Sequence, residues 1–490
     1  MSSIAIIGSG MGGLVAGNLL AKKGHKVTIF ESHSTPGGYT TGFWRKGFYF
    51  ESGTFSFESS QHVFSVMKDI GVFDKIEFTR QYGRWIAPQF DCVVHSWNEL
   101  KTAILDAYPS EKMYFTRYFA EVDTMCNVMR SLTPPKNVFS AIAYPFKLMR
   151  GMTILKKYDK MTASEFTAQY LEKDSIGYQV LKDMGYPDMS ALIIAGAVLS
   201  FLEDYWTVKT GMQSWADVLA DNFKKLGGEL MLNSYVDKII TKNGVAVGVS
   251  CGGKTYDADY VLSASDYKKT FLKLLDDTSM LPKAFIEKLE NAAVSESFFT
   301  VYLGLNLPYE KMKEYLKVPH VSYHTGQSVD FNNTREENFF EKTSCMFYSP
   351  SLHNPELAPK GKSSLMITAM SPHKWMNNWG VGNKQMYKKL KENVKNALIE
   401  KASAIIPNVK KHIVYDDAAT PLTYERYTHN TDGASSAWSW NPHKRFYKNI
   451  ISTRVNTLVK NLYISSCWSN QIGGVPGAIS AAYKCAKKIQ

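Results

Sequence analysis

The sequence predicts an α/β fold of composite α+β type: a discontinuous domain on a parallel sheet, with an inserted domain of mixed sheet and helices. Two stretches at opposite ends of the chain support this prediction. Residues 4–32 give a short apolar strand, a glycine-rich turn, a helix and a second strand, and residues 461–488 give a strand, a Gly-Gly turn and a helix. A chain of 490 residues, 44% of them hydrophobic, is long enough to form two domains or one large composite domain.

The first stretch begins with the apolar run 4–7, which is typical of a parallel strand covered on both faces. The residues that follow contain the pattern G-x-G-x-x-G at Gly8, Gly10 and Gly13. A helix then extends to Gly24, and a second apolar run predicts the next strand.

Each feature of such a turn has a physical role. Gly8 permits the tight turn, Gly10 lets the backbone approach a pyrophosphate, and Gly13 allows the helix to pack closely on the strand. The helix N-terminus offers free N–H groups to the phosphates. Glu31, at the end of the second strand, is placed to accept hydrogen bonds from both ribose hydroxyls and to repel a 2′-phosphate. Residues 4–32 therefore predict a Rossmann-type dinucleotide-binding unit.

The segment after Glu31 favours FAD over NAD. It contains Gly37-Gly38, three further glycines up to Gly53, and a hairpin pattern around Lys46-Gly47. A simple NAD dehydrogenase would begin another helix here. A glycine-rich excursion instead carries the backbone along the pyrophosphate and ribityl chain of a longer cofactor.

The N-terminal stretch resembles the signature of FAD-dependent amine-oxidase-type flavoproteins, in particular the phytoene desaturase, carotenoid isomerase and retinol saturase group. The resemblance covers the whole chain, because further stretches fit the same pattern in the same order. These are "TGMQSWADVLADNFKKLGGELMLNSYVDKI" (210–239), "ADYVLSASD" (258–266), "APKGKSSLMI" (358–367), "TPLTYERYTHNTDGASSAW" (420–438) and "NLYISSCWSNQIGGVPGAISAAYKCAKKI" (461–489).

The resemblance implies an FAD cofactor and hydride transfer between flavin N5 and a lipophilic polyene or isoprenoid. The reaction would be desaturation, saturation or isomerisation. It places a valine, here Val236, against the adenine, and the C-terminal helix with its N-terminus towards the flavin. The implied cofactor residues are Gly8, Gly10, Met11, Gly12, Gly13, Glu31, Gly37, Gly38, Tyr39, Val236, Ser466, Cys467, Gly474, Val475 and Ala478.

The chain departs from the family pattern at two places. Tyr39 stands where many relatives carry Arg or Lys, and Ser465-Ser466-Cys467 replaces a glycine-containing triplet. No second strand–G-x-G-x-x-G–helix unit is present, because Gly380-Val381-Gly382 lies among polar residues. The sequence therefore predicts no NAD(P)H site, and oxygen, a quinone or a protein remains as the electron partner.

We expect the FAD-binding domain to comprise residues 1–75, 205–285 and 450–490. Residues 76–204 and 286–449 would form the substrate-binding domain. Within the latter, 189–202 predicts a buried helix, since it is too short to span a bilayer, and 296–306 predicts a sheet strand over the flavin.

Residues 134–158 mix large apolar side chains with Lys and Arg, and two interpretations stay open. The segment is either a basic amphipathic stretch that dips into a membrane and admits a lipophilic substrate, or a core helix with a solvated basic side. The early first strand leaves no room for a signal peptide, and six scattered cysteines fit a reducing compartment. We expect a cytoplasmic protein, with peripheral association with the membrane as the open alternative.

Other functional classes lack supporting patterns. The net charge is +12, but no nucleic-acid-binding motif accompanies it. The histidines, including His320 and His324 around "VSY", show no metal-ligand spacing and are interpreted as ordinary core or surface residues. Two alternatives on the same scaffold remain: an FAD oxidase of an amine or other small polar molecule, and a protein whose FAD is structural.

Proton-transfer residues are predicted only weakly. The candidates are Tyr424, Glu425 and Arg426 in "TYERY", with Glu58 in "SFESS" as a further acid. Flavin chemistry requires substrate alignment and a dry pocket, so acids and arginines of this kind also fit structural ion pairs.

Overall fold

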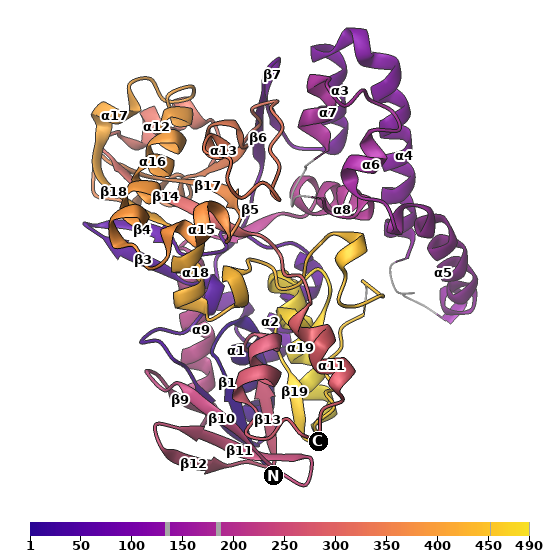
Figure 1. The fold of residues 1–490 in the computed structure, drawn as a ribbon, viewed down its shortest axis with the longest axis vertical. Coiled ribbons are helices and arrows are strands. Elements are labelled where there is room, and N and C mark those ends of the chain that lie inside the picture. The colour runs from indigo at the N-terminus through magenta and orange to yellow at the C-terminus, as the bar shows by residue number, and fades with distance from the viewer. Residues whose placement is uncertain (133–137, 183–187, 451, 490) are drawn as a thin grey trace.

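Two sheets organise the protein, each with its own helical cover (Figure 1). The structure is a computed structural model that describes residues 1–132, 138–182, 188–450 and 452–489. The five-stranded sheet lies in the lower half of Figure 1, beside both chain termini, and the seven-stranded sheet lies above it. Helices α3 to α8 form a separate group beside the upper sheet.

The five-stranded sheet is parallel and has the order β19-β13-β1-β2-β9. Its strands are β1 Ser3–Ile7, β2 Lys26–Phe30, β9 Glu229–Met231, β13 Tyr260–Ser263 and β19 Leu462–Ile464. The predicted strands at both ends of the chain are confirmed, and the sheet joins them. The carboxyl ends of β1 and β13 lie together, because Ile7 pairs with Ser263 in register.

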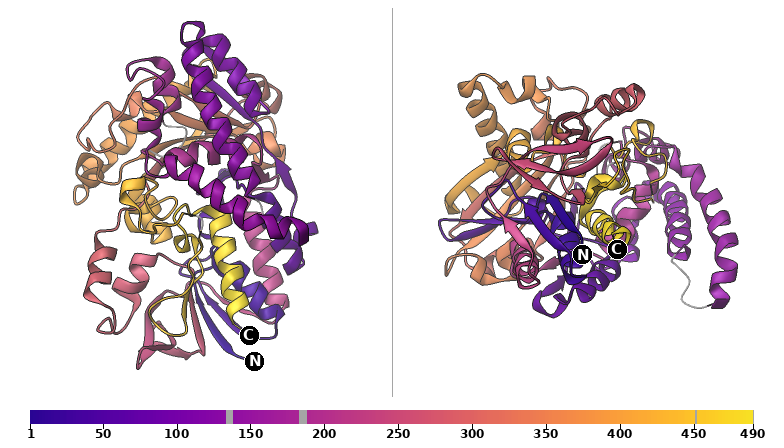
Figure 2. Two further views of the ribbon diagram at one scale, coloured as in Figure 1. Left: turned by 90° about the vertical axis from the view of Figure 1, so that its right-hand side faces the viewer. Right: turned by 90° about the horizontal axis from the view of Figure 1, so that it is seen from below.

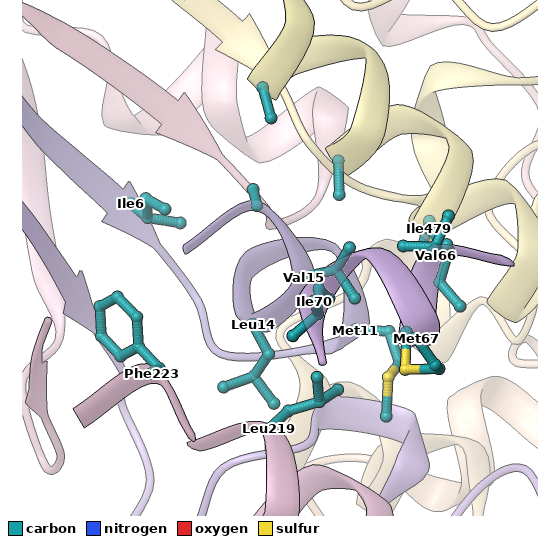
Figure 3. Close-up of a cluster of buried hydrophobic side chains, with 14 of the residues drawn as sticks. Ile6, Met11, Leu14, Val15, Val66, Met67, Ile70, Leu219, Phe223 and Ile479 are labelled. Carbon is teal, nitrogen blue, oxygen red and sulfur yellow. The ribbon is translucent and has the colours of Figure 1, made fainter. Parts of the chain in front are cut away.

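Helices from four parts of the chain cover this sheet and share one apolar core (Figure 3). They are α1 Met11–Lys22, α2 Ser60–Ile70, α9 Met212–Lys225 and α19 Gly474–Lys488. Leu14 and Val15 of α1 are fully buried in this core, where Leu219 of α9 and Ile479 of α19 also lie. The N-terminal and C-terminal helices are therefore held together by the same core.

The predicted hairpin around Lys46-Gly47 is confirmed. Strands β3 Gly42–Arg45 and β4 Phe48–Glu51 pair antiparallel, and both turn residues have positive φ, 51° at Lys46 and 83° at Gly47. That combination matches the right-handed twist of the flanking strands. A three-stranded antiparallel sheet is formed by β10 Val236–Lys242, β11 Val245–Cys251 and β12 Lys254–Asp257.

The seven-stranded sheet has the order β18-β14-β17-β16-β15-β6-β7 and is antiparallel except for the parallel pair β15–β6. The strand predicted at 296–306 is confirmed as β14. The strands are β6 Gly83–Ala87, β7 Phe90–Val94, β14 Ser297–Leu305, β15 His320–Tyr323, β16 Cys345–Tyr348, β17 Ser363–Ser371 and β18 Ile413–Ala419. The flanking helices are α12 Tyr309–Leu316, α13 Phe339–Lys342, α14 Pro350–His353, α15 Trp375–Gly380, α16 Lys384–Ala402, α17 Val409–His412 and α18 Pro421–Thr428.

The helices that follow β7 and precede α9 in the sequence have a core of their own, which includes Phe115, Tyr118 and Phe166. They are α3 Trp97–Ala107, α4 Lys112–Ser131, α5 Val138–Asp159, α6 Ala163–Thr167, α7 Ile176–Leu181 and α8 Ala191–Ala197. The buried helix predicted at 189–202 is α8, which continues as a π-helical turn over Val198–Leu202. Within the described residues, no helix is both long and apolar enough to cross a bilayer.

Helix α5 lies at the edge of the molecule in both Figure 1 and the view from below in Figure 2. Residues 134–137 of the predicted amphipathic segment lie outside the described residues, and the rest of that segment is within α5. The five-stranded sheet uses residues 3–30, 229–263 and 462–464, while the seven-stranded sheet uses 83–94 and 297–419. Chain segments thus alternate between the two sheets, which favours the predicted domain boundaries, and these remain a prediction.

Candidate functional site

One large cavity of about 1500 Å³ is lined by residues from both sheets and from the helical group. Ile7 and Phe30 line it from the parallel sheet, and Phe298 and Thr368 line it from the mixed sheet. A site for one small molecule is typically about 300–1,000 Å³. The cavity is therefore large enough for a cofactor and a second molecule.

The turn between β1 and α1 forms one part of the wall. Gly10 precedes α1, and the first N–H groups of any α-helix lack partners within the helix. A Cβ added at Gly10 would meet nothing closer than Gly38, at 4.0 Å, so the space beside this backbone is open. Gly8, Gly10, Met11 and Gly12 all line the cavity. Open backbone at a helix N-terminus fits a pyrophosphate.

Glu31 is held rigidly at the end of β2. Its Oε2 accepts hydrogen bonds from the backbone N and the hydroxyl of Ser9, at 2.8 and 2.7 Å. Its Oε1 accepts from the backbone N of His33 at 2.9 Å. The side chain is almost completely buried yet lines the cavity, so an acid stands beside the glycine turn where the sequence predicts a ribose.

The Gly37-Gly38 pair lies against this turn. The backbone N of Gly37 donates to Ser9 O at 2.9 Å, and φ is 129° at Gly37 and 60° at Gly38, which only glycine adopts readily. Tyr39 lines the cavity, but its hydroxyl donates to the carbonyls of Gly433 and Ala434, at 3.2 and 3.0 Å. Tyr39 thus ties this loop to the segment 433–434.

The C-terminal motif closes the same wall. Ser465 approaches α1 so closely that a Cβ on Gly12 would lie 1.8 Å from its carbonyl oxygen, and its hydroxyl donates to Gly12 O at 3.0 Å. Ser466, Cys467 and the first turn of α19 line the cavity. Burial raises the pKa of the Cys467 thiol to about 12, so it stays protonated. Two helix N-termini, of α1 and α19, therefore face one cavity and favour negative charge there.

The structure brings almost all predicted cofactor residues together. Val236, at the start of β10, lines the cavity with its neighbours Ser234 and Tyr235. Gly13 is the exception among the predicted set, because it faces β1: a Cβ there would lie 2.0 Å from Gly8 O. Its predicted role was helix–strand packing, and its position agrees with that role. The residues present fit FAD.

The three predicted proton-transfer residues on α18 lie outside the cavity lining. Tyr424 is buried and shares a 2.8 Å hydrogen bond with the hydroxyl of Thr300. Glu425 pairs with His373 at 2.9 Å, and Arg426 donates to the hydroxyl of Tyr427 at 2.8 Å. These contacts are structural, and the geometry gives the catalytic prediction no support.

Glu58 is the acid that the structure does place in the cavity. Burial, with a smaller contribution from the nearby Asp204 carboxylate, raises its pKa from the ordinary 4.5 to about 7. Gly474, at the first turn of α19, is close to it: a Cβ on Gly474 would lie 3.6 Å from Oε1 of Glu58. An acid with a pKa near neutrality inside a ligand cavity is suited to exchanging a proton.

A second part of the wall is apolar and comes from α8, with its π-helical turn, and from α5. Seven residues of α8 and its π-helical turn line the cavity, as do apolar residues of α5. Single π-turns within helices are frequent at functional sites. The apolar lining residues here are Leu192, Ile193, Ala197, Leu199, Phe201, Met149, Met152 and Leu155. The hydrophobicity of 189–202 predicts only a buried helix, whereas one of the two interpretations of 134–158 is an entry for a lipophilic substrate.

The fold and the site define a flavoprotein: a Rossmann-type unit with a glycine turn, a ribose acid and a closing helix, opening onto an apolar chamber. The chain belongs to the family of flavin-containing amine oxidoreductases, whose family model matches residues 11–490. The protein is an FAD-dependent oxidoreductase.

Similar proteins span the full chain at low identity. A 4,4′-diapophytoene desaturase (4,4′-diapolycopene-forming) from Methylomonas sp. is 26% identical over 99% of this chain and 94% of its own length. An all-trans-retinol 13,14-reductase from Danio rerio is 24% identical over 99% of this chain and 85% of its own length. The solved structure of an oxidoreductase from Methanosarcina mazei has a TM-score of 0.64 and 17% identity, covering 99% of this chain and 100% of that one.

Proposed function

We propose that this protein oxidises, reduces or isomerises C–C bonds of a lipophilic polyene or isoprenoid-like substrate. The observation that carries the proposal is the continuity of the cavity. The glycine turn and Glu31 line the same space as the apolar helices α8 and α5. The names of the desaturase and the retinol reductase, which act on polyenes, support the same substrate class.

FAD, when bound, supplies the acceptance or donation of a hydride. Residues of the chain bind the cofactor, orient the substrate and exclude water. The N-terminus of α1 and the backbone at Gly10 hold the pyrophosphate, and Glu31 holds the ribose. The apolar wall of α8 and α5 orients a lipophilic chain and excludes water.

We assign proton transfer to the carboxyl group of Glu58. A CH–CH unit that becomes C=C loses one hydride and one proton. The Glu58 carboxylate would take that proton on an Oε atom, and the neutral acid would return one in the opposite direction. A pKa near 7 makes both forms accessible at neutral pH.

The proposal is tested by anaerobic bleaching of the flavin with a panel of polyenes, retinoids, quinols and amines. We expect bleaching by a polyene or retinoid. Bleaching by amines alone would overturn the lipid substrate and favour the alternative, an FAD oxidase of an amine or other small polar molecule. The electron partner that reoxidises or reduces the flavin is proposed to be oxygen, a quinone or a protein.

We further propose that α5 contacts a membrane surface. Phe146 and Met149 are 73% and 65% exposed, although both are strongly apolar. Exposed Lys147, Arg150 and Lys156 lie on the same helix. Met149 also lines the cavity, so a lipophilic substrate could pass from the lipid into the site beside it.

A further inference from the structure

One strand of the mixed sheet directs three polar side chains into the cavity. Alternate residues of a strand face the same side, so His320, Ser322 and His324 share one face of β15 and its continuation. All three line the cavity. Val321 faces the opposite side and is fully buried in the apolar core of the sheet. The backbone N of His324 donates to Ile86 O at 2.8 Å, which extends the pairing with β6.

The surroundings of these side chains are mainly aromatic and apolar. The His324 ring stacks on Trp85, with centroids 5.3 Å apart and planes 16° from parallel. The His320 ring lies 5.8 Å from Phe55 and 5.6 Å from Tyr205. Met346, opposite Ser322 on the neighbouring strand, also lines the cavity. The histidines, together with Ser322 and Tyr323, are thus polar points in mainly aromatic and apolar surroundings.

Each histidine has one buried ring nitrogen without a protein partner in the described part of the chain. Among the residues that the structure describes, Nε2 of His320 and Nε2 of His324 have no hydrogen-bond partner, although both atoms are buried. Burial lowers the pKa of each ring to about 4, so both imidazoles are neutral at pH 7. A neutral imidazole offers one N–H donor and one acceptor. Buried polar groups without partners are rare and call for a physical reason.

A metal ion is not the partner that this arrangement favours. No cluster of three or more His, Cys, Asp or Glu side chains suited to a metal occurs in the described part of the chain. A carboxylate is also a poor match, because neither ring carries charge at neutral pH. An uncharged oxygen can both donate to and accept from neutral imidazoles.

We propose that His320 and His324 form a polar subsite with two contact points, each of which hydrogen-bonds a hydroxyl or carbonyl oxygen on the lipophilic substrate. The two residues are four positions apart on an extended strand, so their Cα atoms lie roughly 13 Å apart and the rings bind different oxygens. The inference rests on the proposed function and narrows it: the substrate is an oxygenated isoprenoid or polyene, and a pure hydrocarbon binds less well. A hydrocarbon would fill the chamber but leave both Nε2 atoms unpaired, which a pocket built for hydrogen bonding discriminates against.

The test compares a matched pair of probes on the FAD-reconstituted protein. All-trans-retinol carries a hydroxyl, and axerophtene is its hydrocarbon counterpart. We expect equilibrium dialysis to give a dissociation constant about tenfold lower for the alcohol, the size expected for a hydrogen bond made in a buried site. The single hydroxyl reaches only one of the two rings, so one of the variants His320→Leu and His324→Leu should weaken alcohol binding, and neither should weaken hydrocarbon binding. His320→Gln, which keeps a donor and an acceptor, should retain part of the preference.

His353 provides the matched control. Its Nε2 is also buried without a partner among the described residues, and burial lowers its pKa to about 4, but it does not line the cavity. His353→Leu should therefore leave the preference unchanged. If the wild type binds the two probes equally, the subsite is overturned, but the proposal of a lipophilic substrate stands. A preference that persists in both Leu variants of the lining histidines also overturns it. If neither probe binds, both the subsite and the proposed substrate class are overturned.

Discussion

Two glycines of the first turn differ in what surrounds them. A Cβ on Gly12 would lie 1.8 Å from Ser465 O, whereas a Cβ on Gly10 would have no neighbour closer than 4.0 Å and would enter the space assigned to the pyrophosphate. Gly10 has φ −66° and ψ 179°, which alanine adopts without strain. A substitution at Gly12 should therefore affect folding, and one at Gly10 should affect cofactor binding.

We predict that Gly12→Ala lowers the free energy of unfolding of the apoprotein by about 1–3 kcal/mol, because the backbone of Ser465 must move. Gly10→Ala should leave that free energy within about 0.5 kcal/mol and weaken FAD binding at least tenfold. Urea denaturation and FAD titration measure the two quantities. If both variants lost stability equally, with unchanged FAD affinity, the assignment of the turn would be wrong.

From the raised pKa of Glu58 we predict that the rate of flavin reduction increases with pH. When the substrate is oxidised, the carboxylate form accepts the proton, and its fraction rises as the pH passes through the pKa of about 7. The rate of anaerobic flavin reduction should therefore increase from pH 6 to pH 8 and level off above. Glu58→Gln should remove this step and lower the rate about 10²-fold or more.

The matched control for Glu58 is Glu425→Gln. Glu425 pairs with His373 and lies outside the cavity lining, so this variant should keep the pH step and most of the rate. A step near pH 7 that survives in Glu58→Gln would assign the proton transfer to another group.

Helix α5 allows the two interpretations of residues 134–158, a membrane-contacting segment and a core helix, to be tested against each other. Leu155 and Tyr158 are buried and anchor the helix, while Phe146, Met149 and Met152 remain exposed. The segment thus has both a packed side and an exposed apolar side, which an ordinary core helix does not need.

We predict that the double variant Phe146→Ser, Met149→Ser reduces co-sedimentation with anionic lipid vesicles at least fivefold. Salt should weaken the binding further, because the basic side chains of α5 add a screened attraction to the headgroups. Met113→Ser is the control, since Met113 on α4 is 63% exposed but does not line the cavity. Unchanged sedimentation of the double variant would favour the core-helix interpretation.

The elements that the sequence predicts well are those with local signals. The first strand, helix and second strand fall within about three residues of the prediction, because apolar runs, glycines and the terminal acid are all local features. The site residues on these elements were predicted for the same reason. Hydrophobicity likewise predicted α8, but not that its residues line a cavity, since apolar helices look alike whether they face a core or a ligand.

Other parts of the site depend on contacts between distant segments. His320 lies beside Gly83 only because β15 pairs with β6, a parallel pairing across more than two hundred residues. The alternation in "HVSYH" was a usable signal, but nothing in it indicates which face meets the cavity. Glu58 and Glu425 were equivalent candidates in the sequence, and only the packing of α19 and α18 separates them.

At the scale of the whole molecule, the cofactor cradle joins segments from both ends of the chain. The N-termini of α1 and α19 face the same cavity, and the two helices share one core. The cradle therefore exists only in the folded protein, so FAD binds the native state and not the unfolded chain. By mass action, such a ligand stabilises the native state of the whole unit.

We predict that free FAD at about 100 times its dissociation constant raises the free energy of unfolding by about 2.7 kcal/mol, seen as a higher urea midpoint. Riboflavin at the same concentration should have a much smaller effect, because it lacks the pyrophosphate and the adenosine that α1 and Glu31 are placed to hold. Gly10→Ala should lose most of the FAD effect while keeping the midpoint of the apoprotein. An equal shift with riboflavin and FAD would show that the nucleotide half of the cofactor is not bound by this turn, and would remove the basis for placing FAD across both termini.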